Sequence, residues 1–326
     1  MTPAELSRTV LGALRCAVAD GEVASVPQEV LGRVTVAVPR PGGYGDYACN
    51  VALLAAGPAH TSPLVLAGIL RERLRHDPRL ADVRVTGPGF LNFALSDPAT
   101  YERDLVAETL APRRGDALAG HRVTLRPLGE RAHVLAEAVV RLTRAQGGQA
   151  DVSETTGEPL RAAPPYERTA PLDPESRRWA LLHTAPADRP RLDAALLVQR
   201  VENPLFLVRY AHSRALALVR NAAALGYAPE PGDSGPHAAP LLALLAEHPV
   251  VLLRAAEHRA PDRLARRLVR VADALLDLHD RTGGLLPLGG LKPGAAHRAR
   301  LALAEAAGTV LAGGLTLLGI SAPPYV

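Results

Sequence analysis

The clearest pattern of hydrophobic and polar positions lies between residues 202 and 226, where apolar side chains recur every three or four residues. This spacing predicts an amphipathic helix. Asn203 is a good N-cap, and Pro204 follows at the first helical position, where its missing N–H costs nothing. The predicted apolar face consists of Phe206, Tyr210, Ala217 and Leu218.

A second face of the same helix is polar. Its members fall together at helical spacing, within hydrogen-bonding reach of anything that docks there. Two interpretations are open: a binding face, or the solvated side of a helix whose other side is core. The polar positions are Arg209, His212, Ser213 and Arg220.

The first hundred residues mix helix and strand signals. Residues 2–5 form a capping box, which predicts a helix whose apolar face runs from Leu6 to Val18. Residues 34–38 have the pattern of a strand, and residues 42–56 that of a turn running into a helix. Together with the later elements they predict an α+β unit. Those later elements are a helix at 62–75 and strands at 83–86 and 90–95, joined by a tight Gly-Pro-Gly turn.

The middle of the chain is less regular. A helix is predicted at residues 97–110, a strand at 123–125 and a second helix at 131–146, ending at two glycines. Residues 147–175 are rich in Gly, Pro, Thr and Glu, a composition typical of a linker.

Arginines recur at spacings of four, three and four residues late in the chain, which predicts a basic stripe on one helix. Such a stripe neutralises phosphates and gives salt-dependent, sequence-blind affinity for nucleic acid. The alternative is an ordinary solvated face. The stripe consists of Arg259, Arg263, Arg266 and Arg270, and the roughly opposite apolar positions are Leu264, Leu268, Val271 and Leu275.

Composition narrows the class of protein. A hydrophobic content of 48% and a charged content of 21% are typical of a soluble globular chain, and two cysteines argue against a disulfide scaffold. No apolar run approaches the ~20 residues of a membrane span, and the first residues have no secretion signal, so we expect a cytoplasmic protein. The net charge of +4 permits a polyanionic partner without requiring one.

Two stretches of the second half resemble one family. Asn-Pro-x-Phe followed by Tyr-Ala-His-x-Arg, at residues 203–214, resembles the first long helix of the anticodon-binding domain of arginyl-tRNA synthetases. Residues 299–323 resemble the closing helix and tail of that domain. Two matches in the right order are more specific than either alone.

The first hundred residues resemble the same family. GDYACN at 45–50 and GPGFLNF at 87–93 are similar to phrases of its N-terminal additional domain, which contacts the D-loop of the tRNA elbow. The alternatives are that Asn50 satisfies backbone groups in a turn and that Phe90 belongs to a core. The resemblance implies these D-loop-side residues: Tyr47, Asn50, Phe90 and Asn92.

On the anticodon side the chain departs from the family in part. Leu275, Leu278 and His279 stand where family members usually have aromatic residues, and the tail ends with Tyr325 and Val326 instead of a charged residue and Met. Tyr325 can still stack on a base. The implied anticodon-side residues are Arg209, Tyr210, His212, Arg214, Arg220, Arg263, Arg266, Arg270 and Tyr325.

The catalytic signatures of the family are missing. Class I synthetases use a His-x-Gly-His turn at a helix N-terminus to meet ATP phosphates; the corresponding residues 126–137 contain one histidine, His133. Arg126 and Arg131 remain as candidates to hold a phosphate there. A Lys-Met-Ser-Lys type loop is absent, because the only lysine is Lys292 and the only methionine is Met1. We therefore expect no catalytic residues, no cofactor and no metal site.

The sequence thus predicts an α+β N-terminal additional domain and an all-α, DALR-type anticodon-binding bundle, joined by a vestigial α/β segment. The expected domain limits are 1–97, 98–174 and 175–326. By resemblance the chain is a truncated, catalytically inactive paralogue of arginyl-tRNA synthetase.

We expect its partner to be tRNA, with arginine tRNA the first candidate, and neither DNA nor a membrane. A role as an adaptor for a tRNA-dependent enzyme is the leading hypothesis. The alternatives are a protein-interaction module that has lost RNA binding and an accessory subunit of an arginine–tRNA ligase.

Overall fold

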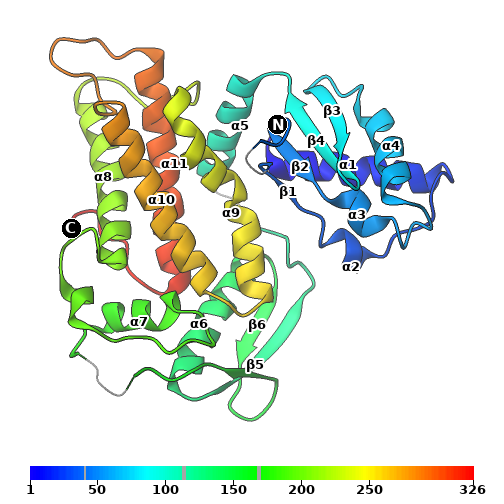
Figure 1. Ribbon diagram of the computed structural model, residues 1–326. Coiled ribbons are helices and arrows are strands. Elements are labelled where there is room, and N and C mark those ends of the chain that lie inside the picture. Colours follow the sequence, from blue (N-terminus) through cyan, green and yellow to red (C-terminus); the bar gives the residue numbers. More distant parts are fainter. Residues whose placement is uncertain (40–41, 112–114, 167–169) are drawn as a thin grey trace. The chain divides into compact units, whose positions relative to one another are not determined.

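The computed structural model describes residues 1–39, 42–111, 115–166 and 170–326. The chain forms two compact units, Met1–Leu105 and Val106–Val326, which are coloured blue to cyan and cyan to red in Figure 1. Each unit is described by itself.

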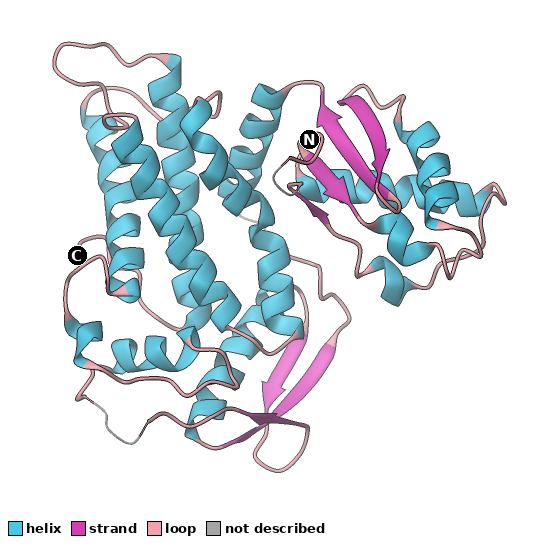
Figure 2. Cartoon of the chain, in the orientation of Figure 1, coloured by secondary structure: helices cyan, strands magenta, loops and turns pink. Residues whose placement is uncertain are grey.

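The first unit contains an antiparallel sheet with strand order β1-β2-β4-β3 (Figure 2). Its strands are β1 (Val36–Ala37), β2 (Tyr47–Cys49), β3 (Leu80–Thr86) and β4 (Phe90–Leu95). Its helices are α1 (Pro3–Ala19), α2 (Gln28–Leu31), α3 (Val51–Ala55) and α4 (Pro63–Leu74), and α5 (Pro98–Leu110) crosses the boundary between the units.

Local sequence signals explain these elements. The predicted capping box is confirmed, because the Glu5 N–H donates to Thr2 Oγ1 at 3.2 Å and the Thr2 N–H donates to Glu5 Oε2 at 2.9 Å. The hairpin between β3 and β4 is also confirmed, with Thr86 opposite Phe90. At its turn Gly89 has φ +133°, and a Cβ there would lie 2.9 Å from Pro63, so this close approach requires glycine.

The second unit begins with a small parallel α/β segment. Strand order β6-β5-β7 joins β5 (Arg122–Leu128), β6 (Gln149–Val152) and β7 (Glu158–Arg161), with α6 (Glu130–Ala145) as the crossover between β5 and β6. The predicted linker at 147–175 is therefore wrong for these two strands. Each is only four residues long and buries a single side chain, Ala150 or Leu160. The sequence therefore lacks the alternation of apolar and polar residues from which a strand is predicted.

The rest of the unit is helical, and α11 packs against both α8 and α10, which also pack against each other (Figure 1). Two glycines of α11 bring the helices close: a Cβ on Gly308 would lie 2.9 Å from Ala215 of α8, and one on Gly314 would lie 2.4 Å from Leu268 of α10. The helices are α7 (Pro174–His183), α8 (Pro204–Ala224), α9 (Ala239–Glu257), α10 (Asp262–Arg281) and α11 (Ala295–Leu318), with 3₁₀ turns at Ala194–Leu197 and Pro236–Ala238.

Arg131, in the first turn of α6, connects the α/β segment to the segment after α7. Its side chain is buried and, within the described part of the chain, donates to backbone oxygens alone, including Ala163 O at 2.7 Å and Thr184 O at 2.6 Å. The expectation that Arg131 holds a phosphate is wrong, since its guanidinium is already surrounded by carbonyls. The remaining acceptors are the carbonyls of Leu181, Ala185, Pro186 and Asp188.

Two more arginines bind the C-terminal end of α11. Arg141 of α6 donates to Leu317 O at 2.9 Å, and Arg178 of α7 donates to Leu318 O at 2.8 Å. Cations are favourable at a helix C-terminus because the last carbonyls carry partial negative charge. The same helix end turns through Gly319, which has φ +74°.

Two helical stretches, Pro236–Glu257 and Ala295–Leu318, are long and apolar enough to cross a membrane by length and composition. In the second, 67% of the most apolar window is buried in the molecule. In the first that share is 33%. A mostly buried helix such as the second is what a bundle has at its core.

Replacing Arg131 by Met should destabilise the second unit by about 2–4 kcal/mol, because several buried carbonyls lose their donor. The measurement is urea unfolding followed by the fluorescence of Trp179, the only tryptophan, which is buried in α7. Arg254→Met on the exposed side of α9 is the control and should change stability by less than about 0.5 kcal/mol. Equal stability of both variants would contradict this role of Arg131.

Candidate nucleic-acid interface

The predicted N-cap of α8 is confirmed. Asn203 Oδ1 accepts from the N–H groups of Leu205 at 3.1 Å and Phe206 at 3.4 Å. Its Nδ2 donates to Leu196 O and Val198 O, both at 2.9 Å. Asn203 thus fixes both the start of α8 and the chain that enters it.

The polar face of α8 contacts the end of the chain itself, residues 319–326, which we call the C-terminal strap. Arg209 forms an ion pair with Glu175 of α7 and donates from Nη2 to Ser321 Oγ at 3.0 Å. Ser213 Oγ donates to Pro324 O at 3.0 Å. The strap thus occupies much of the face where RNA contacts were expected.

His212 is buried between helices. Its Nδ1 lies 3.1 Å from Gly308 O of α11, and because a carbonyl oxygen accepts, the imidazole donates. Burial lowers the pKa of His212 below its ordinary value, which keeps the ring neutral. In this position His212 supports the packing of α8 on α11, so it lies neither on a binding face nor on a solvated face, and both interpretations are wrong for this residue.

Two other α8 residues stay nearer the surface. Arg214 Nη2 donates to His279 Nε2 of α10 at 2.7 Å, and burial together with the Arg214 charge lowers the pKa of His279. Tyr210 is half-buried and stacks on Phe206, with ring centroids 5.8 Å apart. At the strap, the Arg220 guanidinium lies 4.5 Å from the ring centroid of Tyr325.

The face of α10 carries three exposed arginines, Arg263, Arg266 and Arg270, which we call the α10 arginine row. Arg266 pairs with Asp262, whereas in the described part of the chain the side chains of Arg263 and Arg270 make no hydrogen bond or ion pair. The predicted apolar face is confirmed, since its members are fully buried: Leu264, Leu268, Val271 and Leu275.

Arg259 does not belong to this row, so the predicted four-arginine stripe is wrong at its first member. It precedes the helix, has φ +51° and pairs with Glu158 of β7 at 2.7 Å. The helix begins only at Asp262, because the Ala260-Pro261 pair closes the turn after α9.

The exposed side of α10 changes sign along its length. Beyond Arg270 the next positions at helical spacing are Asp273, Asp277 and Asp280, and Asp277 pairs with Arg281 at 2.7 Å. At 1.5 Å per residue the arginine row is about 10 Å long. It therefore matches two or three phosphates at most, and the second half of the helix repels them.

Of the four predicted D-loop residues, Phe90 is the one whose side chain is exposed. Phe90 is 39% exposed, whereas Tyr47 is buried with its ring 5.6 Å from that of Tyr101. Asn92 is buried and donates to Thr86 Oγ1 at 2.5 Å. Asn50 Oδ1 accepts from the Thr35 N–H at 2.8 Å, which is the backbone-satisfying role given as its alternative.

Tyr44 and Arg84 are surface candidates that the sequence reasoning missed. The Arg84 guanidinium lies 3.7 Å from the centroid of the Tyr44 ring, and both side chains hydrogen-bond Asp82, at 2.7 and 2.6 Å respectively. Arg84 of β3 lies opposite Asn92 of β4, and Asn92 is two residues from Phe90 along the same strand. The alternation of Asp82, Arg84 and Thr86 with buried or half-buried valines is the signal that places them on one face.

Among the described residues, no three His, Cys, Asp or Glu side chains come together to hold a metal ion.

Family models match both ends of this architecture. The Arginyl tRNA synthetase N terminal domain matches residues 8–95, and the DALR anticodon binding domain matches residues 208–325. Neither match includes residues 96–207.

Similar curated proteins are arginine–tRNA ligases. That of Clavibacter sepedonicus is 36% identical over 184 residues, which cover 51% of this chain and 32% of that protein. Those of Micrococcus luteus and Frankia alni are 37% and 38% identical over 47% and 46% of this chain. The aligned part spans about a third of the length of these relatives.

The solved arginyl-tRNA synthetase of Thermus thermophilus has a similar fold, with a TM-score of 0.68 and 14% identity over an alignment that covers 100% of both chains. At this identity the likeness shows the fold alone, whereas the two domain matches show that the chain contains domains of the tRNA synthetase kind. It is related to the arginyl-tRNA synthetases, whose N-terminal domain and DALR domain it contains.

The second unit should lose stability as the pH falls from about 7.5 to about 5. Burial lowers the folded-state pKa of His212 and His279, so the unfolded chain takes up protons that the folded protein does not bind. Their contribution is fully present above about pH 6.5. Urea midpoints at both pH values check this, and His212→Gln should reduce the difference. A difference unchanged in that variant would contradict the role given to His212.

Proposed function

We propose that this chain binds tRNA and does not itself join arginine to it. The observation that carries the proposal is the α10 arginine row, on a helix of an anticodon-binding type of domain. In this proposal residues 1–97 form the D-loop-binding domain, 98–174 the joining segment and 175–326 the anticodon-binding domain.

Helix stability does not explain the arginine row. Cations near a helix N-terminus oppose the helix dipole, and so do carboxylates near its C-terminus. In α10 the three exposed arginines lie in the first half and Asp273, Asp277 and Asp280 in the second half. The dipole acts within the first and last turn, so Arg263 and Asp280 are the two misplaced charges there, each costing up to about 1 kcal/mol, while Asp262 and Arg281 are placed favourably. A phosphate partner at the first half would recover that cost.

The strap adds an aromatic position. Tyr325 is 70% exposed while Arg220 lies against its ring, so a base can stack on the open part of the ring. Arg214 and Tyr210 lie on the same helix as Arg220 and complete the proposed anticodon side. Arg209 and His212 act indirectly on the anticodon side. Arg209 hydrogen-bonds the strap, and His212 hydrogen-bonds α11.

On the elbow side we propose Phe90 as the stacking residue, with Tyr44 and Arg84 as additional contacts. Tyr47, Asn50 and Asn92 support the sheet and the turn from which those side chains project. The two sides are proposed separately, because each belongs to its own unit.

Absence of ligase activity is supported by the start of α6. The one buried cation there, Arg131, is bound to backbone carbonyls and cannot also neutralise a triphosphate. The missing His-x-Gly-His and Lys-Met-Ser-Lys sequences agree with this. An adaptor that presents or sequesters a tRNA in the cytoplasm is the role that we propose.

A second candidate is a protein-interaction module. It is favoured by the strap, which fills the polar face of α8, and by the acidic second half of α10. Loss of RNA binding under every condition would select it over the first.

Replacing both Arg263 and Arg270 by Ala should weaken tRNA binding about 10- to 100-fold at low salt. It should also reduce the slope of log affinity against log salt by about 2, since two phosphate contacts are lost. Filter binding over a series of salt concentrations measures both. Arg281→Ala on the same helix, whose charge is paired with Asp277, is the control and should bind as the wild type. A double variant with wild-type affinity and slope would rule out the arginine row.

Replacing Tyr325 by Ala should weaken tRNA binding about 5- to 100-fold, because a base loses its stacking partner, whereas Tyr325→Phe should bind as the wild type. Fluorescence anisotropy of labelled tRNA gives the comparison. The proposal for the strap is wrong if the Ala variant binds as tightly as the Phe variant.

A further inference from the structure

An aromatic pocket lies outside both matched domains, in residues 163–193. Two extended segments run side by side there: the Ala163 N–H donates to Pro186 O at 2.8 Å, and the Tyr166 N–H donates to Pro190 O at 3.2 Å. The second segment alternates, with Pro190 and Leu192 buried and the residues between and beyond them exposed. Those exposed residues are Arg189, Arg191 and Asp193.

Tyr166 is 44% exposed and lies beside two cations. The guanidinium of Arg189 is 4.7 Å from the ring centroid and that of Arg191 is 6.0 Å away. Arg189 also donates to the carbonyls of Pro164 at 3.3 Å and Pro165 at 3.0 Å, which fixes its position. Arg191 makes no hydrogen bond or ion pair among the described residues, so its donors are available to a ligand.

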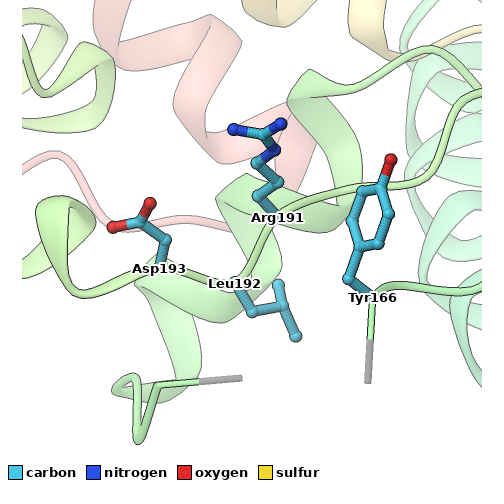
Figure 3. Close-up of a pocket in the computed structure, with 4 residues that line it drawn as sticks. All are labelled: Tyr166, Arg191, Leu192 and Asp193. Carbon is cyan, nitrogen blue, oxygen red and sulfur yellow. The ribbon is translucent and has the colours of Figure 1, made fainter. Parts of the chain in front are cut away.

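The pocket has a volume of about 280 Å³ and is lined by Tyr166, Arg191, Leu192 and Asp193 (Figure 3). The Tyr166 hydroxyl and the Arg191 guanidinium point the same way, and the buried Leu192 side chain points the opposite way. Asp193 Oδ1 accepts from the Ala195 N–H at 2.7 Å, which orients the carboxylate.

We propose that this pocket binds one nucleoside 5′-phosphate, either a free nucleotide or one nucleotide of a single-stranded RNA. An aromatic ring stacks on a base, and a guanidinium binds a phosphate through paired donors. A carboxylate accepts from an exocyclic amino group, such as N4 of cytosine. The volume, near the lower end of the ~300–1,000 Å³ typical of ligand pockets, suits one base and not two.

Other ligand classes fit less well. A cationic ligand is repelled by Arg189 and Arg191, and inorganic phosphate makes no use of the exposed part of the Tyr166 ring. The combination of ring, guanidinium and carboxylate favours a base with an amino group, so cytidine nucleotides should bind better than uridine nucleotides. This site is independent of the α10 arginine row and does not rest on tRNA binding.

Calorimetric titration of the full chain with CMP, UMP, cytidine, ribose 5-phosphate and inorganic phosphate tests the proposal. CMP should bind with a dissociation constant below about 1 mM and at least about 10-fold more tightly than each of the others. Absence of CMP binding, or equal binding of CMP and ribose 5-phosphate, would overturn it.

Variants assign the binding to the pocket. Tyr166→Ala and Arg191→Ala should each weaken CMP binding at least about 10-fold, while Tyr166→Phe keeps it within about 2-fold. Arg161→Ala, an exposed arginine of β7, is the matched control for Arg191 and should leave binding unchanged. Wild-type affinity in Tyr166→Ala with an unchanged unfolding midpoint would overturn the assignment.

A further arm separates the two sources of the nucleotide. A short oligocytidine without terminal phosphates that binds more tightly than CMP identifies an RNA strand, and the reverse order identifies a free nucleotide. Either order of affinity supports the proposed pocket, provided that Tyr166→Ala weakens the binding of both ligands. These ligands are too short to span the tRNA-binding surfaces. If they do not bind, the proposal for this pocket is wrong, but the proposal that the chain binds tRNA is not affected.

Discussion

The packing of the second unit depends on the backbone carbonyls that accept hydrogen bonds from its buried arginines. A guanidinium cannot lose its charge, so burying Arg131 requires partners for its donors. Among the residues that the structure describes, its acceptors are carbonyl oxygens of Ala163, of Leu181 in α7 and of the segment that follows α7, and no carboxylate. Because every one of those carbonyls must stay in place, the arginine fixes the path of the chain between α7 and α8. Arg141 and Arg178 do the same at the end of α11, where the strap begins.

This arrangement decides which surface is left for a partner. With the end of α11 fixed, the strap follows α8 and engages Arg209 and Ser213, so these residues face the protein. The basic surface that remains open on the bundle includes the α10 arginine row and Arg220 beside Tyr325. A short cationic row flanked by carboxylates gives modest, salt-sensitive affinity, so specificity has to come from stacking and from the shape of the RNA.

The sequence was most informative where local rules decide structure. The capping box at Thr2, the cap at Asn203 and the turn at Gly89 each depend on neighbours within a few residues, and their predictions are confirmed. The partners of individual site residues lie far away in the sequence and were not predictable. His212 hydrogen-bonds the Gly308 carbonyl, Arg259 forms an ion pair with Glu158, and Arg209 donates a hydrogen bond to Ser321. Strands β6 and β7 were missed for the same reason, because only their pairing with β5 stabilises such short segments.

The central claim is that a bundle of the anticodon-binding type still binds tRNA here. Binding of the purified chain to arginine tRNA, to other tRNAs and to an unrelated RNA, each at low and high salt, tests it most directly. The account predicts that tRNA binds more tightly than the unrelated RNA and that this preference persists at high salt, when sequence-blind phosphate contacts are weakened. Equal binding of every RNA that disappears with salt, or no binding at low salt, would contradict it.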